Sequence, residues 1–195
     1  MDINSLLGTV LSSDSINQMS QTTNVSAEGV QNVLSSALPS LLNGALAQSN
    51  GADTAEGFAG ALTQHAAADT NDLSAFLSNV DLQDGGKIVG HLLGGDQSAV
   101  VEEAAQRAGI SAADSGNVLS AVAPLLMSLL GKEAASQQSN NSAAVSGLMG
   151  SLLQNVDMGS LLTGLLGGGA AQNTGSASSG KKKSGLAGLL ENLLK

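Results

Sequence analysis

The sequence predicts an all-α protein: an array of short helices built from a tandem duplication, with a flexibly tethered C-terminal helix. Composition is the first reason, because 42% of the 195 residues are hydrophobic but the only aromatic side chains are Phe58 and Phe76. A core of aliphatic and alanine side chains suits closely packed helices rather than a β-sandwich, which favours aromatic and β-branched residues. Apolar residues also recur at helical spacing, and only two prolines interrupt the chain.

The tandem duplication is the third reason. With a shift of 85 residues, like residues coincide at three places: 25–27 on 110–112, 32–35 on 117–120, and Pro39 on Pro124. With three residues inserted in the second copy, the matches continue upstream: Gly8 on Gly90, Leu11 on Leu93, and Asp14 on Asp96. So many matches in one order predict two copies of one helical unit, over residues 1–50 and 85–135.

Each copy is expected to begin with an amphipathic helix. In the first copy the apolar positions have the spacing of one helix face: Ile3, Leu6, Leu7, Val10 and Leu11. A loop at 84–86 is expected before the second copy's first helix. The apolar positions of that helix are Ile88, Val89, Leu92 and Leu93.

Two further helices follow in each copy. Residues 96–108 are expected to form a short helix that ends at Gly109, because glycine is favoured just beyond helix ends. Ser111 is expected to cap the next, longer helix, with Asp114 three residues on, and Ser26 to cap its equivalent. The two prolines are expected to kink or break these long helices, since proline has no backbone N–H donor.

The remaining segments have distinct compositions. Residues 51–84 are expected to form one or two connecting helices, and the polar run 133–142 to be a linker or a helix extension. Residues 143–166 are expected to be a Gly/Leu-rich helical segment, and 167–184 a Gly/Ser/Lys linker whose composition cannot bury a core. Residues 185–195 are expected to form a short amphipathic helix. A free helix of this length is unstable in water, so it must dock to be ordered.

Two stretches of the second copy resemble a known family. Residues 84–94 read DGGKIVGHLLG and residues 123–131 read APLLMSLLG. Both resemble characteristic stretches of the DUF937 (YidB-like) family. The resemblance covers roughly residues 5 to 131. It implies a bacterial all-α array of short helices. It implies no biochemical activity, no cofactor and no site residues.

The net charge of −9 limits the expected partners. Such a field repels nucleic acids and anionic lipid surfaces at long range. The chain has no cysteine, which excludes disulfides, thiolate nucleophiles and cysteine-based zinc sites. An acidic residue stands near the N-terminus where a secretory signal carries basic ones, and no run of about 18 apolar residues predicts a membrane span. A cytoplasmic protein is therefore expected.

The sequence predicts no catalytic, cofactor-binding or metal-ligating residue, and so no enzyme. The histidines are His65 and His91, and neither belongs to a metal-binding spacing such as H-x-x-x-H. His91 is expected to be a helix-packing or capping residue, and His65 to face solvent. The neighbouring acids Glu102 and Glu103 diverge by about 100° on a helix and therefore predict a solvated face.

The expected function is a non-enzymatic interaction or structural role, with self-association through the Leu/Gly/Ala-rich C-terminal helices, because unpaired amphipathic helices bind grooves on neighbours. The lysines at 181–183 fit a solubilising flank and a contact to anions equally well. Two alternatives stay open. One is an acidic DNA-associated regulator with a helix-turn-helix-like turn at 101–121, although the second helix there has no basic side chain. The other is a small-ligand binder or enzyme with a site near His91.

Overall fold

A computed structural model describes residues 3–136 and 142–154, and every regular element in them is a helix, which confirms the all-α class. The α-helices are α1 Ile3–Val10, α2 Ser13–Thr23, α3 Ala27–Asn50, α4 Ala55–Ala66, α5 Leu73–Ser78, α6 Leu82–Leu93, α7 Gln97–Ala108, α8 Ala112–Ser136 and α9 Ser142–Gln154. A short 3-10 helix, η1 (Gly94–Asp96), joins α6 to α7. The expected connecting segment thus contains two helices, α4 and α5.

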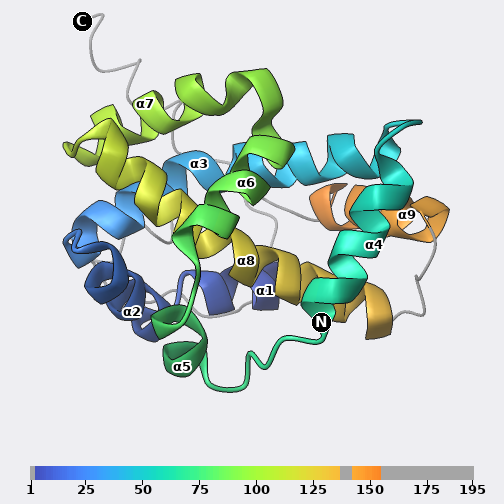
Figure 1. Ribbon diagram of the computed structural model, residues 1–195, viewed down its shortest axis with the longest axis horizontal. Coiled ribbons are helices and arrows are strands. Elements are labelled where there is room, and N and C mark those ends of the chain that lie inside the picture. The colour runs from blue at the N-terminus through green and yellow to red at the C-terminus, as the bar shows by residue number, and fades with distance from the viewer. Residues whose placement is uncertain (1–2, 137–141, 155–195) are drawn as a thin grey trace, which may run out of the picture.

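Helix α8 forms the centre of the core and runs through the middle of the molecule (Figure 1). All the other described α-helices contact it, and every residue from 121 to 131 is buried. A helix surrounded on all sides needs no polar face, which explains its apolar composition. An 18-residue window of α8 has a mean hydropathy of 1.4, high enough for a membrane span by composition, but 83% of that window is buried inside the fold.

Three glycines lie where helices cross in close contact. The pairs are Gly85 of α6 on the carbonyl of Ser120 in α8, Gly44 of α3 on the carbonyl of Leu92 in α6, and Gly131 of α8 on the carbonyl of Leu62 in α4. A Cβ atom at any of the three positions would overlap that backbone. These crossings therefore depend on the absence of a side chain.

Neither proline breaks its helix, so the expected break is wrong. Pro39 lies inside α3 and Pro124 inside α8, and both helices continue through them. Pro124 has no N–H to donate to the carbonyl of Ser120, four residues earlier. In the fold Gly85 packs against that same carbonyl. Burial on a neighbouring helix holds α8 in one piece despite the missing hydrogen bond.

The pairs α2–α3 and α7–α8 are joined by turns of the same kind. Asn24 and Gly109 end the first helices in the left-handed region, at φ 57° and 66°. Ser26 Oγ accepts from Gly29 N at 3.1 Å, and Ser111 Oγ accepts from the Asp114 amide at 3.0 Å. These hydrogen bonds confirm both expected caps. The tandem duplication stays a prediction, because unrelated helix pairs also use left-handed caps.

One expected boundary is wrong. Residues 84–86 lie inside α6, because the Asp81 carboxylate caps that helix, accepting from Gln83 N at 2.8 Å and Asp84 N at 3.2 Å. The polar run after Lys132 begins as a helix extension, one of its two expected forms, since α8 continues to Ser136. The predicted linker at 167–184, the predicted helix at 185–195 and most of the segment 143–166 lie outside the described residues.

Candidate functional site

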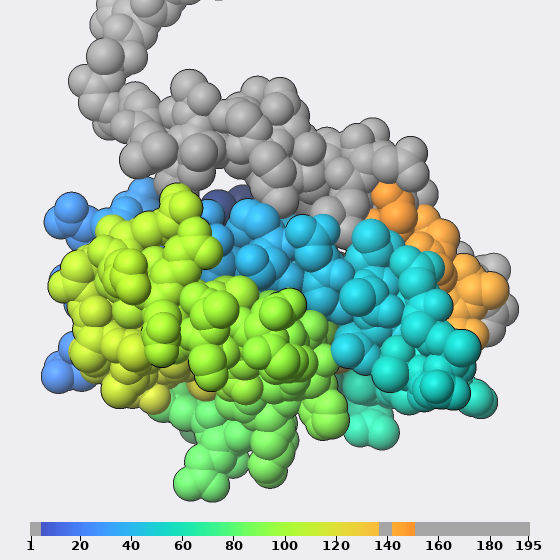
Figure 2. All heavy atoms as spheres, turned by 90° about the horizontal axis from the view of Figure 1, so that it is seen from above, coloured from blue at the N-terminus to red at the C-terminus, as the bar shows by residue number. Residues whose placement is uncertain are grey.

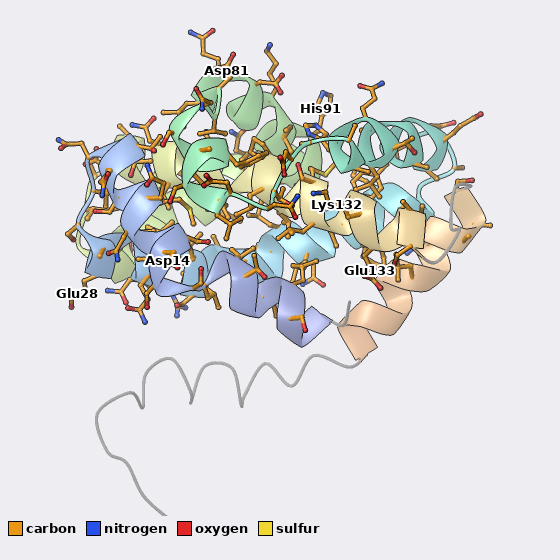
Figure 3. All side chains as sticks on the ribbon, turned by 90° about the horizontal axis from the view of Figure 1, so that it is seen from below. Asp14, Glu28, Asp81, His91, Lys132 and Glu133 are labelled. Atoms are coloured by element: carbon orange, nitrogen blue, oxygen red, sulfur yellow. The ribbon has the colours of Figure 1, made fainter. Side chains whose placement is uncertain are left out.

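His91 is exposed on α6, and its side chain stands at the edge of the molecule (Figure 3). The expected packing role is therefore wrong, because Leu92 and Leu93 supply the buried face of that turn. The backbone of His91 forms a hydrogen bond between helices: its carbonyl accepts from Gln48 Nε2 at 2.7 Å. His65 is half-buried in α4 rather than facing solvent. In residues 3–136 and 142–154, no three His, Cys, Asp or Glu side chains are grouped to hold a metal ion.

The paired acids lie on the outer face of α7. Glu102 and Glu103 are both exposed, which confirms the predicted solvated face. Arg107 Nη2 donates to Glu103 Oε1 at 2.7 Å, and these side chains are 65% and 61% exposed. An ion pair this open to water contributes little to stability. The same ion pair occupies Arg107, the one arginine of the sequence, which lies just before the helix-turn-helix-like turn.

The helix-turn-helix-like segment has the expected shape, but the start of its second helix carries few groups that could read DNA. At the start of α8, Ala112, Ala113 and Asn117 are exposed. Ser111 Oγ donates to Asp114 Oδ2 at 2.7 Å, so this carboxylate is part of the helix cap. From Ala121 to Gly131 every residue of the helix is buried. DNA recognition normally needs basic side chains on the phosphates, and this surface offers one amide and one carboxylate.

A shallow depression of about 360 Å³ lies between α2 and the start of α5. It is open to solvent, and its lining residues are Asp14, Asn71, Asp72, Leu73 and Ser74. Asp72 Oδ1 accepts from Ala75 N at 2.9 Å and so caps α5. No histidine, lysine or arginine lines the depression, so the histidine or lysine that usually activates a serine nucleophile is absent there. Sequence reasoning did not find it, because packing of α5 on α2 brings its two halves together.

Sequence reasoning also missed a buried carboxylate near the end of α8. Glu133 is 4% exposed, and Figure 3 labels it on α8, one residue after Lys132. Lys132 Nζ donates to Thr70 Oγ1 at 2.6 Å, which ties α8 to the segment before α5. The available signal was helical spacing, since Glu133 follows the buried Leu129 by four residues.

Comparison with known proteins places the chain in a family. A family model described as a bacterial protein of unknown function, DUF937, matches residues 5–133, about two thirds of the chain. The chain belongs to the DUF937 family. The match extends from α1 to near the end of α8, so the resemblance at 84–94 and 123–131 is confirmed. No curated protein and no solved structure matches this DUF937 protein.

Proposed function

We propose that this DUF937 protein is a non-enzymatic cytoplasmic protein that works by self-association through its C-terminal segment, residues 185–195. One observation carries the proposal: the apolar stripe of α1 recurs in that segment. With a shift of 183 residues, all five positions coincide: Ile3, Leu6, Leu7, Val10 and Leu11 on Leu186, Leu189, Leu190, Leu193 and Leu194.

Helix α1 illustrates how this fold uses such a stripe. Leu6, Leu7 and Val10 are 1%, 3% and 0% exposed, and α1 packs on α2 and α8. A segment with the same stripe has the pattern that helices of this fold bury against one another. A second copy of the chain offers helices of the same kind, which makes it the simplest partner.

The described surface has no exposed large apolar side chain that could bind a partner in place of the segment 185–195. Among the side chains described, in residues 5–136 and 142–150, no Leu, Ile, Val, Met or Phe is exposed. Apolar surface patches commonly mark protein partners, so an apolar contact has to come from elsewhere in the chain. The segment 185–195 lies outside the described residues, and its sequence supplies that apolar surface.

Charge supports the same pairing. Residues 3–154 hold thirteen acidic and three basic side chains, whereas residues 155–195 hold four lysines and two acids. Three of these lysines, at 181–183, directly precede the apolar segment. The acidic body of a second copy therefore attracts the basic flank of the segment.

Light scattering on the full chain and on a truncation after Gly169 tests the proposal. We expect the full chain to have a mass that is a multiple of one chain's mass, and the truncated chain to be a monomer. The same oligomeric state for the two would contradict self-association through this segment.

A matched pair of variants of the full chain separates the stripe from general polarity. Leu189→Asp with Leu190→Asp should abolish assembly, because both charges fall on the apolar face. Gly188→Asp with Asn192→Asp places the same charges on the other face and should preserve assembly. Loss of assembly in both variants alike would mean that the stripe is not the contact.

A further inference from the structure

Helix α5 packs on a defined face of α2. Thr22 Oγ1 donates to the carbonyl of Leu77 at 3.1 Å, and Gln18 Nε2 donates to Ser78 Oγ at 2.9 Å. The Leu77 side chain is fully buried, at 0% exposure. Gln18 and Thr22 are half-buried as a result of this cover. This face of α2 is therefore a helix-docking surface with one apolar anchor and two hydrogen-bonding side chains.

The equivalent face of α7 has no such cover from the described helices. With the shift of 85, Gln18 falls on Glu103 and Thr22 on Arg107. Both of these α7 side chains are more than half exposed. Figure 2 shows α7 on the outer surface of the described part of the molecule. In that part, α7 packs mainly on α3, α6, α8 and η1.

Apart from α5, the helices that pack around α2 have counterparts around α7. Helix α2 contacts α3 and α8, and α7 contacts α8 and α3. The long helices α3 and α8 trade places between the two arrangements. Accordingly, α4 packs on α8, whereas α9 packs on α3. The arrangement around α7 therefore repeats that around α2, apart from an equivalent of α5.

The sequence contains a candidate for that missing helix, directly after α9. With the same shift of 85, the α5 region falls on residues 157–165. The matched positions are Asp72 on Asp157, Leu73 on Met158, Phe76 on Leu161, Leu77 on Leu162, Ser78 on Thr163 and Val80 on Leu165. The capping aspartate, the apolar anchor, the hydroxyl and the flanking apolar positions all recur. These residues lie outside the described ranges.

We propose that residues 157–165 dock as a short helix on the α7 face of the same chain that carries Glu103 and Arg107. The hydrogen-bonding groups are complementary. The Arg107 guanidinium can donate to the carbonyl of Leu162, as Thr22 does to Leu77. The Glu103 carboxylate can accept from the Thr163 hydroxyl, at the place where Gln18 donates to Ser78.

The connection favours docking within one chain. Helix α9 ends at Gln154, so only residues 155 and 156 separate it from the segment. The matching connection, from α4 to α5, is also short, from residue 67 to 72. The inference is independent of the proposed function. It assigns 157–165 to the fold and leaves 185–195 for a partner.

Engineered cysteines test the docking cleanly, because the full chain has none of its own. The test variant carries Glu103→Cys and Thr163→Cys. A reference variant carries Gln18→Cys and Ser78→Cys at the contact that the structure shows. A control variant carries Glu102→Cys and Thr163→Cys, because Glu102 lies about 100° around the helix. Mild oxidation is followed on non-reducing gels and by mass spectrometry.

We expect the test variant to close a disulfide within one chain about tenfold faster than the control, because disulfides need closely placed Cα atoms. Equal rates for the two would overturn the proposal, and so would disulfides that link two chains.

Hydrogen exchange gives a second readout that needs no cysteine. Leu162→Asp should raise amide exchange in α7 and leave α2 unchanged, whereas Leu77→Asp should raise it in α2. Unchanged exchange in α7 of the Leu162→Asp variant would overturn the docking.

Discussion

At the scale of single residues, Gly85 and Gly60 show how one helical glycine differs from another. A Cβ at Gly85 would overlap the carbonyl of Ser120, whereas a Cβ at Gly60 has no atom within 4 Å. Intrinsic helix propensity favours alanine over glycine at both positions by about 1 kcal/mol. Any difference between the two alanine substitutions in the free energy of unfolding therefore measures the effect of the helix crossing.

We predict that Gly85→Ala lowers the free energy of unfolding by at least about 2 kcal/mol, because α6 must move away from α8. Gly60→Ala should raise it by about 0.8 kcal/mol, since only propensity acts there. Urea unfolding followed by circular dichroism measures both. If Gly85→Ala were as stable as the parent, the close crossing would not contribute to the fold.

Sequence reasoning could not separate these glycines, and it placed Gly85 in a loop. A pair of glycines after an aspartate is typical of a turn. The helix forms there because Asp81 caps it and because α8 accepts a backbone at close range. The carbonyl involved, on Ser120, lies 35 residues away in the sequence. Local patterns contain no information on such a contact.

At the scale of elements, the turns after α2 and α7 decide how the long helices begin. Both use a left-handed residue, but α2 uses Asn24 and α7 uses Gly109. An L-residue with a Cβ costs about 1–2 kcal/mol in this region, and asparagine less than most. A Cβ at Gly109 would have no atom within 4 Å, so conformation alone sets the cost there.

We predict that Gly109→Ala lowers the free energy of unfolding by about 1 kcal/mol. Asn24→Gly should raise it slightly, by about 0.5 kcal/mol, because glycine adopts this conformation more easily than asparagine. Thermal and urea unfolding of the two variants give the comparison. A stabilising Gly109→Ala would show that this turn relaxes out of the left-handed region.

These turns could be predicted from the sequence, whereas the close helix crossings at glycines could not. The end of α7 at Gly109 and the caps at Ser26 and Ser111 involve residues at most five apart. That both long helices continue through their prolines could not be predicted from the sequence. Local chemistry predicts a break at Pro124, and the helix continues because the neighbours of α8 bury it on all sides.

At the scale of the whole molecule, charge determines which partners can approach. The basic side chains in residues 3–154 are Lys87, Arg107 and Lys132. Lys87 lies 4.0 Å from Asp84, Arg107 pairs with Glu103, and Lys132 donates to Thr70. The described surface therefore lacks the positive stripe that nucleic-acid binding needs.

We predict that the full chain does not retard a random DNA duplex on a gel at about 50 mM salt, where electrostatic binding is strongest. The acidic field repels the phosphates at this ionic strength. A basic DNA-binding protein run alongside serves as the positive control. Retardation that weakens as salt rises would favour the alternative of a DNA-associated regulator.

The sequence by itself determined the all-α class, the family and the local signals that begin and end helices. Each depends on composition or on residues within about one helical turn of each other. Only the tertiary structure decided that Gly85 lies inside a helix, that Glu133 is buried and that His91 is exposed. These features depend on which face each helix turns toward a neighbour distant in the sequence. That choice is made by packing of the whole core around α8.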